Sequence, residues 1–321
     1  MSTFSLAQLE AAAELVHSVF PGTPQYQWPL LSRRTGCETW VKHENHTPVG
    51  AFKLRGGLVY MKDRLDRGEN GGVIAATRGN HGQSIATAGA RYGIPVTIVV
   101  PKGNSREKNA AMQAQGADLI EVGDDFQEAF EQAGKIAEER GLFMLPSMDM
   151  KLVEGVASYA LELFRAQPDL DTVYVPIGMG SGVCSVIAAR DALGLRTKVV
   201  GVVSEGAPAY ALSFETGKAI PTERADTFAD GVACRSPLPY VVDMIRSGAD
   251  RVVTVSDAEI EAAIRAYYTD THNIAEGAGA VPLAALMQEK DKMAGRKVGV
   301  ILTGGNIDRD VYVDILSRGD E

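Results

Sequence analysis

Two kinds of hydrophobic pattern alternate along most of the chain. Short apolar runs rich in Val and Ile predict buried strands, and stretches with an apolar residue at every third or fourth position predict helices. We expect strands at residues 72–77, 96–100, 119–122, 143–145, 172–177, 198–204 and 297–302. Helices are expected at residues 81–92, 106–115, 126–140, 151–165 and from Val183 onward. This alternation is typical of an α/β protein, in which helices wrap a mostly parallel sheet.

The N-terminal part of the chain adds three elements before this alternation begins. Residues 5–20 predict a helix that ends at Pro21-Gly22-Thr23-Pro24, and residues 38–43 alternate like a short strand. Residues 53–67 predict a second helix, which closes at Gly68. The sequence contains no internal repeat, low-complexity tract or linker, so composition alone places no domain boundary.

Composition and charge limit the classes of protein that need to be considered. The 321 residues are 45% hydrophobic and 23% charged, which is ordinary for a globular chain long enough to bury two cores. A net charge of −9 argues against nucleic acid or an anionic membrane surface as a partner. The three cysteines are scattered, so we expect a reduced, cytoplasmic setting without a disulfide framework or zinc site. We expect neither a signal peptide nor a transmembrane span.

The first candidate for chemistry is Lys53. A turn around Thr47-Pro48 and Gly50 leads into the helix that begins near this lysine, and its neighbours Ala51 and Phe52 are apolar. Apolar surroundings lower the pKa of a lysine because they disfavour its charged form, and the neutral amine is the form that attacks a carbonyl group. A surface lysine at the start of a helix is the alternative when this stretch is considered alone.

A second candidate is the polar turn Thr77-Arg78-Gly79-Asn80-His81-Gly82-Gln83, which joins a buried strand to a helix. Unpaired backbone N–H groups and the helix dipole attract a carboxylate or a phosphate at such a place. Asn80 suits a neutral ring substituent, although an asparagine there could also simply cap the helix. The five histidines lack the spacing of metal ligands, which favours a structural role for His81 over a metal-binding one.

A third candidate is the loop Gly178-Met179-Gly180-Ser181-Gly182, which follows a strand and precedes a helix. Alternating glycines let backbone N–H groups surround a phosphate. Glu205 lies where a dinucleotide-binding unit carries its ribose-binding acid. However, Val183 occupies the place of that motif's third glycine, so a single terminal phosphate suits the loop better than a pyrophosphate.

The last expected strand ends in Thr303-Gly304-Gly305-Asn306, at the carboxyl edge of a sheet, where open α/β sheets bind ligands. Thr303 offers a neutral hydrogen bond there. The four stretches together supply an amine, an amide, a phosphate cradle and a neutral hydroxyl. These match the aldehyde, ring hydroxyl, phosphate and ring nitrogen of pyridoxal phosphate.

In these motifs, from Thr23-Pro24 to Asn306-Ile307-Asp308, the chain resembles the fold type II pyridoxal-phosphate enzymes, and within them the serine/threonine dehydratase and serine racemase group. The resemblance implies a two-lobed architecture in which each lobe is a mostly parallel sheet wrapped by helices. Residues 1–71 and 150–321 would form the large cofactor-binding domain, and residues 72–149 the small domain with the substrate loop. A homodimer is the habit of this family.

The resemblance also implies roles for individual residues. Lys53 corresponds to the lysine that forms the Schiff base with the cofactor, Asn80 to the asparagine that contacts the ring hydroxyl, and Thr303 to the residue opposite the pyridine nitrogen. The other implied cofactor-binding residues are Phe52, Gly178, Met179, Gly180, Ser181, Gly182 and Glu276, the last within Glu276-Gly277-Ala278-Gly279-Ala280. The implied substrate-binding residues are Thr77, Arg78, Gly79, His81 and Gln83.

The chain departs from the family pattern at several of these motifs. Thr77-Arg78 replaces two serines, and the second serine exchanges a proton on the face opposite the lysine in racemases. Arg78 is too basic for that exchange, so we expect little racemase activity. It either clamps a carboxylate or turns away to pair with an acid. Ala51 replaces a serine, and Gly155-Val156-Ala157-Ser158 replaces G-Q-G-T. The stretches at residues 77–84 and 155–162 resemble the dehydratases of hydroxyectoine utilisation.

Some relatives bind a divalent cation through a Glu, a backbone carbonyl and an Asp that follow the phosphate loop. Glu205 and the carbonyl of Ala209 match two of these ligands, but Ala211 replaces the Asp, so we expect no metal site. The stretch Ala229-Asp230-Gly231-Val232-Ala233 is intact, which favours the dehydratases over the cysteine synthases.

The expected activity is that of a pyridoxal-phosphate-dependent ammonia-lyase. It eliminates water from a 3-hydroxy amino acid, such as L-threonine or L-serine, and yields a 2-oxo acid and ammonia, with Lys53 as general base. The expected substrate becomes 3-hydroxyaspartate if Arg78 grips a second carboxylate. Two alternatives stay open: a nicotinamide-dependent oxidoreductase that uses residues 178–182 and Glu205, and a non-catalytic protein that binds pyridoxal phosphate or amino acids. Because the chain ends soon after Gly305, we expect no effector-binding domain.

Overall fold

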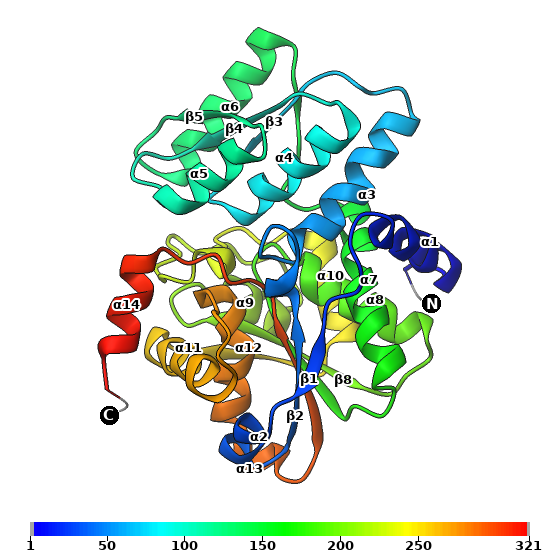
Figure 1. Cartoon of the computed structure of the whole chain (residues 1–321), viewed down its shortest axis with the longest axis vertical. Helices are drawn as coiled ribbons and strands as arrows, with labels where there is room; N and C mark the ends of the chain where they lie inside the picture. Colours follow the sequence, from blue (N-terminus) through cyan, green and yellow to red (C-terminus); the bar gives the residue numbers. More distant parts are fainter. Residues whose placement is uncertain (1–2, 320–321) are drawn as a thin grey trace.

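The computed structural model describes residues 3–319, which build a larger sheet and a smaller one above it (Figure 1). The larger sheet has six strands in the order β1-β2-β10-β7-β8-β9. Its strands are β1 (Gln25–Gln27), β2 (Glu38–His43), β7 (Thr172–Pro176), β8 (Lys198–Ser204), β9 (Arg251–Val255) and β10 (Lys297–Leu302). Only the pairing of β1 with β2 is antiparallel among the strands of this sheet.

The smaller sheet has four parallel strands in the order β5-β4-β3-β6. They are β3 (Val73–Ala76), β4 (Val96–Val100), β5 (Asp118–Glu121) and β6 (Phe143–Met144). Every residue of β3 and β4 is buried, as expected for parallel strands that helices cover on both faces. The α/β fold class with two largely parallel sheets is therefore confirmed, whereas the exact division into two domains stays a prediction.

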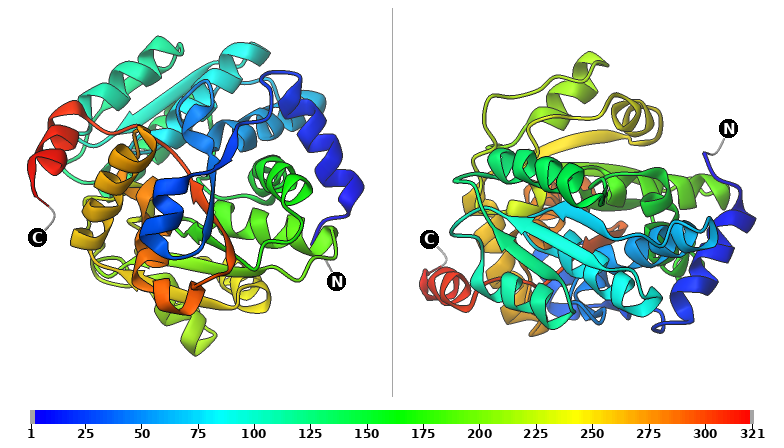
Figure 2. Two further views of the ribbon diagram at one scale, coloured as in Figure 1. Left: turned by 60° about the horizontal axis from the view of Figure 1, so that its bottom comes forward. Right: turned by 90° about the horizontal axis from the view of Figure 1, so that it is seen from above.

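Helices surround both sheets (Figure 2). They are α1 (Leu6–His17), α2 (Pro29–Thr35), α3 (Lys53–Asp66), α4 (Asn80–Tyr92), α5 (Arg106–Ala114), α6 (Phe126–Arg140), α7 (Met150–Ala166), α8 (Ser181–Ala192), α9 (Ala209–Thr216), α10 (Pro239–Gly248), α11 (Asp257–Thr271), α12 (Gly277–Gln288), α13 (Lys290–Met293) and α14 (Arg309–Ser317). Two short 3₁₀ helices, η1 (Glu44–His46) and η2 (Asp230–Val232), lie in loops.

Helix α3 lies between the two sheets and packs against α4 and α7 (Figure 1). Glycines make these contacts close. A Cβ on Gly57 would collide with the Ser84 Oγ on α4, and one on Gly155 of α7 would collide with the backbone carbonyl oxygen of Arg55. Glycine at these two positions therefore lets the backbones approach and fixes the helix that carries Lys53.

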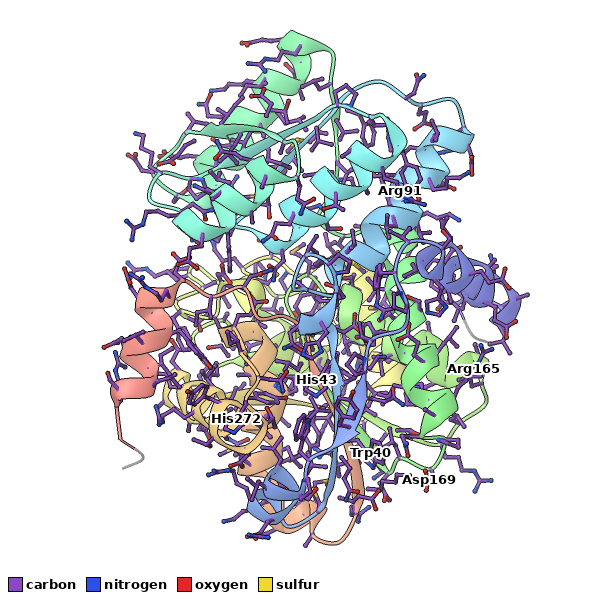
Figure 3. The ribbon with its side chains drawn as sticks, viewed as in Figure 1. Trp40, His43, Arg91, Arg165, Asp169 and His272 are labelled. Atoms are coloured by element: carbon purple, nitrogen blue, oxygen red, sulfur yellow. The ribbon has the colours of Figure 1, made fainter. Side chains whose placement is uncertain are left out.

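Strand β2 leads the chain to this helix. Figure 3 shows Trp40 in the middle of β2 and His43 at the end that lies nearer the smaller sheet. The 3₁₀ helix η1 and a turn follow directly, so the start of α3 lies at the carboxyl edge of the larger sheet. This is the edge at which open α/β sheets bind ligands.

The elements differ from the sequence-based expectations in a few places. Helix α1 ends at His17 and not at residue 20, and α8 begins at Ser181, before the expected start at Val183. The hydrophobic pattern also did not predict β1, β9 and several helices of the C-terminal half. Helix α12 shows why: it contains Pro282, and residues 277–286 are all buried, so its sequence has no polar face that would reveal a helical period.

Candidate active site

The turn before Lys53 is joined to the loop after β10 by backbone hydrogen bonds. The Phe52 N–H donates to the carbonyl oxygen of Thr303 at 3.0 Å, and the Gly305 N–H donates to the carbonyl oxygen of Gly50 at 3.0 Å. Because β10 is an interior strand of the larger sheet, these bonds fix the first turn of α3 at the sheet edge. Lys53 and Thr303 are thereby brought together, as the motifs require.

The amine of Lys53 lies in a largely apolar environment. Its Nζ donates to the Ser181 Oγ at 3.1 Å and lies 5.0 Å from the centre of the Phe52 ring. Burial lowers the pKa of Lys53 to about 8 because the charged form loses its hydration. About one tenth of this amine is therefore neutral, and nucleophilic, at pH 7, far more than for a lysine with the ordinary pKa of 10.5.

The glycine-rich loop is shaped by backbone contacts that leave no room for side chains. A Cβ on Gly178 would collide with the carbonyl oxygen of Gly231, and Gly180 has a φ of +101°. The carbonyl oxygen of Met179 accepts a hydrogen bond from the Tyr210 hydroxyl at 3.2 Å. In a trans peptide the N–H points opposite to the carbonyl, so this bond turns the Gly180 N–H away from Tyr210.

A second set of bonds orients the end of the same loop. The carbonyl oxygen of Gly182 accepts from the Tyr159 hydroxyl at 3.2 Å and from the Ser185 Oγ at 2.7 Å. No side chain caps the N-terminus of α8, whose N-cap residue is Gly180. The first N–H groups of α8 and the positive end of its dipole are thus available to an anion such as a phosphate.

Asn80 is the first residue of α4 and does not cap it, so the helix-cap interpretation of this residue is wrong. The N-cap residue is Gly79, and it makes no side-chain cap hydrogen bond. The Asn80 Nδ2 donates to the Glu276 Oε1 at 2.6 Å, and its Oδ1 accepts from the Asn306 Nδ2 at 2.8 Å. An amide nitrogen has two N–H donors, so one donor of Asn80 remains for a ligand.

The remaining residues of the predicted substrate loop differ in their surroundings. The Gly79 N–H donates to the Thr77 Oγ1 at 3.1 Å, which closes the turn. Arg78 is exposed, and within residues 3–319 its guanidinium forms no ion pair. The Arg78 carbonyl accepts from the Asn104 Nδ2 at 3.2 Å. The arginine is therefore free to reach a ligand that enters from solvent.

His81 and Gln83 are both buried in α4. Burial, together with the charge of Lys53, lowers the pKa of His81 to about 3, and its Nε2 has no hydrogen-bond partner among the described residues. Gln83 lines a cavity of about 330 Å³, whose lining includes Lys108 and Asn306 but neither Lys53 nor the glycine-rich loop. Among the described contacts of the predicted substrate residues, only the electrostatic effect on His81 involves Lys53, and Gln83 faces a different cavity.

Several residues of this site carry no recognisable signal in the sequence. Tyr159 on α7 and Tyr210 on α9 bond to the backbone of the glycine-rich loop, and Asn306 orients Asn80. Lys108 on α5 lies close to Gly79 and to Glu276, although α5 reads as an ordinary polar helix. Only the folded chain brings these residues to the site, because they are distant from one another in the sequence.

In the described part of the chain, no three His, Cys, Asp or Glu side chains are grouped so that they could hold a metal ion. Glu205 follows β8 and is exposed. No helix within residues 3–319 is both long and apolar enough to cross a membrane.

The residues at this site fit pyridoxal phosphate. A lysine amine with a lowered pKa suits its aldehyde, the uncapped start of α8 suits its phosphate, and the free donor of Asn80 suits its ring hydroxyl. A Cβ on Gly182 would have only ordinary contacts, the nearest being the Tyr159 hydroxyl at 3.6 Å. The described protein atoms therefore leave space beside Gly182 that a ligand could occupy.

Comparisons with known proteins agree with this fit. The family model described as pyridoxal-phosphate dependent enzyme matches residues 18–304. The L-threonine ammonia-lyase of Thermotoga maritima is 33% identical over 316 residues, which cover 98% of this chain and 79% of that protein. The L-threo-3-hydroxyaspartate ammonia-lyase of a Pseudomonas species is 32% identical over 95% of this chain and 96% of that protein.

Among solved structures, the processed form of threonine deaminase isoform 2 from Solanum lycopersicum superposes with a TM-score of 0.89 at 31% identity. The match covers 98% of this chain and 94% of that one. These findings contradict the nicotinamide-dependent interpretation of the glycine-rich loop, since the family is defined by another cofactor. The resemblance found in the motifs is confirmed: the chain belongs to the pyridoxal-phosphate dependent enzymes of fold type II, and pyridoxal phosphate is its cofactor.

Proposed function

We propose that this protein is an ammonia-lyase that eliminates water from a 3-hydroxy amino acid and releases a 2-oxo acid and ammonia. The observation that carries the proposal is the amine of Lys53, which lies 3.1 Å from the Ser181 Oγ with a pKa lowered to about 8 by burial. The relatives named as L-threonine ammonia-lyase and L-threo-3-hydroxyaspartate ammonia-lyase support the same chemistry.

Lys53 is both the covalent attachment point and the general base of the proposed reaction. Bound pyridoxal phosphate supplies a conjugated, electron-withdrawing ring that makes the Cα proton of an attached amino acid acidic. Lys53 would hold the cofactor through its amine, and its Nζ, once released by the amine of the substrate, would be the base that takes the Cα proton. The β-hydroxyl departs as water, and a second water releases ammonia and the 2-oxo acid, so water is neither gained nor lost overall.

Other residues bind the cofactor and orient its ring in this proposal. The start of α8 and residues 178–182 bind the phosphate, while Asn80 donates its free N–H to the ring hydroxyl and is itself held by Glu276. Phe52 packs beside the Lys53 amine and excludes water from it. Thr303 offers a neutral hydroxyl and not an acid to the ring nitrogen, which disfavours a long-lived carbanion and thus favours elimination over racemisation.

The substrate carboxylate binds at the start of α4 in this proposal, near Thr77 and Gly79, with His81 behind them as a neutral group. Arg78 supplies a positive charge at the mouth of the site. L-threonine and L-serine are the default substrates, and 3-hydroxyaspartate is favoured if Arg78 binds its second carboxylate. An arginine at this position cannot exchange the proton that racemisation requires.

The test is a comparison of wild type and Lys53→Ala in assays for bound chromophore, ammonia and 2-oxo acid. We expect the wild type to absorb in the visible range and to release both products from a 3-hydroxy amino acid. Lys53→Ala should lose the covalent chromophore and all turnover. A wild-type protein that binds the cofactor but releases neither product from any 3-hydroxy amino acid would support the non-catalytic alternative.

Two further points belong to this proposal. A cytoplasmic location is consistent with the three cysteines, which are all free and buried. A homodimer is proposed because members of the family usually form homodimers. Size-exclusion chromatography with light scattering tests this oligomeric state. The likeness to dehydratases of hydroxyectoine utilisation stays a prediction.

A further inference from the structure

Lys108 on α5 reaches across the gap between the two sheets. Its Nζ lies 2.6 Å from the Asp230 Oδ2 and 3.4 Å from the Glu276 Oε2, while only 8% of its side chain is exposed. Asp230 belongs to η2 and Glu276 precedes α12, so both carboxylates come from the side of the larger sheet. Figure 1 shows α5 beneath the smaller sheet, on the side that faces α14.

The aliphatic part of Lys108 packs against the substrate loop. A Cβ on Gly79 would collide with the Lys108 Cδ, so the lysine stem occupies the place where a side chain of residue 79 would lie. One side chain therefore touches two parts of the site: its stem supports the turn before α4, and its ammonium faces Glu276.

Two carboxylates share this one ammonium. The Asp230 Oδ2 accepts a hydrogen bond from the Lys108 Nζ. The Glu276 Oε2 has no hydrogen-bond partner in the described residues, and it interacts with the positive charge of Lys108 at 3.4 Å. The other oxygen of Glu276 accepts from Asn80. Because Glu276 is buried, its carboxylate form depends on the lysine.

We propose that Lys108 is a positioning residue that controls the charge of Glu276 and, through Glu276, the orientation of the Asn80 amide that meets the cofactor. Asp230 opposes this control, because it takes the hydrogen bond of the same ammonium and adds a negative charge. The charge of Glu276 is thus set by residues from both sides of the gap, and it changes if α5 moves away.

Within residues 3–319, three side chains and one backbone group face Glu276. They are Lys108 from α5, Asp230 from η2, Asn80 from α4 and the backbone of Gly304 after β10, whose carbonyl oxygen accepts from the Glu276 N–H at 3.1 Å. Burial raises the pKa of Glu276 to about 7, Lys108 counteracts this increase, and Asp230 adds to it. Removal of the lysine charge therefore raises this pKa further, and removal of the aspartate charge lowers it.

The experiment is a pH titration of the visible absorbance of the enzyme with its bound cofactor, without amino acid. Lys108→Met keeps most of the stem but removes the charge, and Asp230→Asn removes the competing carboxylate. We expect a wild-type midpoint near pH 7, an increase of about one pH unit or more in Lys108→Met, and a decrease in Asp230→Asn. Glu276→Gln should abolish the transition and so assign it.

The matched control is Arg106→Met. Arg106 lies on the same helix and crosses the same gap, with its Nη2 3.4 Å from the Asp310 Oδ2, but its side chain is 89% exposed. We expect its titration to match that of the wild type. A purely structural role for Lys108 would destabilise the protein without moving the two midpoints in opposite directions.

Three outcomes would overturn the inference: no wild-type transition between about pH 5 and pH 9, no shift in the variants, or shifts of both variants in one direction. If Lys108→Met fails to fold, Asp230→Asn decides alone, because the inference requires its midpoint to fall. The titration uses no substrate, so its result tests the role of Lys108 even if the protein does not have the proposed lyase activity. Only a parallel readout, a lower kcat in Lys108→Met with little change in KM, rests on the proposed function.

Discussion

Arg55 and Glu44 form a completely buried ion pair just beyond Lys53. The Arg55 Nε lies 2.6 Å from the Glu44 Oε2, and neither side chain is exposed. Arg55 also binds Glu162 through its Nη1 at 2.6 Å, so one guanidinium ties the first turn of α3 to η1 and to α7. The helix that carries Lys53 is thus anchored by buried ion pairs that water does not reach.

Loss of the ion pair between Arg55 and Glu44 should destabilise the protein. Arg55→Met leaves Glu44 buried without its partner, and we expect the free energy of unfolding to fall by about 3–5 kcal/mol. Urea denaturation followed by circular dichroism measures it. Arg67→Met, at the exposed end of the same helix, is the control, with an expected change of at most about 1 kcal/mol. Equal losses in the two variants would contradict the prediction.

Gly178 and Gly182 should respond differently to alanine. A Cβ at residue 178 collides with the carbonyl oxygen of Gly231, so Gly178→Ala should destabilise the protein by about 1–3 kcal/mol even without cofactor. A Cβ at residue 182 meets no protein atom closer than 3.6 Å, so Gly182→Ala should fold normally and lose only cofactor affinity. Thermal unfolding and cofactor titration distinguish the two; similar Tm losses in both variants would show that the reasoning fails.

His43 should make the protein sensitive to acid. The Trp28 Nε1–H donates to the His43 Nε2 at 2.9 Å, which requires the neutral imidazole, and burial lowers the pKa of His43 from 6.5 to about 3. The unfolded chain therefore binds the proton more readily than the folded one. The contribution of His43 to the free energy of unfolding is complete above pH 6.5. It falls by about 1.4 kcal/mol per pH unit as the pH drops from 6.5 towards 3.

His43→Gln isolates this effect, because the glutamine oxygen can accept the bond from Trp28 but does not titrate in this range. Urea unfolding of wild type and variant at several pH values between about 4 and 7 gives the two slopes. We expect a shallower slope in the variant. Parallel slopes would mean that His43 does not contribute.

Arg78 should decide which substrate is preferred. If its guanidinium binds a second carboxylate, Arg78→Ser should lower kcat/KM for 3-hydroxyaspartate at least about tenfold more than for threonine, since a charge-assisted hydrogen bond contributes about 1.5–3 kcal/mol. A panel of 3-hydroxy amino acids in both stereochemical series, scored by 2-oxo acid release, measures this. Arg91→Ser, at the far end of α4 (Figure 3), is the control. Equal losses on both substrates would assign Arg78 to general carboxylate binding.

Local chemistry explains what could be predicted of the site. Gly180 needs a left-handed backbone, and Lys53 follows a turn that proline and glycine impose, so both leave a mark in the sequence itself. The role of Asn80 could not be decided from the sequence, because an asparagine at the start of a helix is also the usual residue that caps it. Its bonds to Glu276 and Asn306 exist only because distant segments meet.

The sequence by itself determined the α/β class and most of the strands, because periodicity and turn chemistry act over a few neighbouring residues. Its motifs taken together also indicated the cofactor and predicted that Lys53 meets it. The tertiary structure alone decided the pairing of Arg55 with Glu44, the position of Lys108 beside Glu276 and the tyrosines that orient the glycine-rich loop. These contacts join residues far apart in the chain. Burial then sets the partners of Arg55 and the raised pKa of Glu276, which no local pattern encodes.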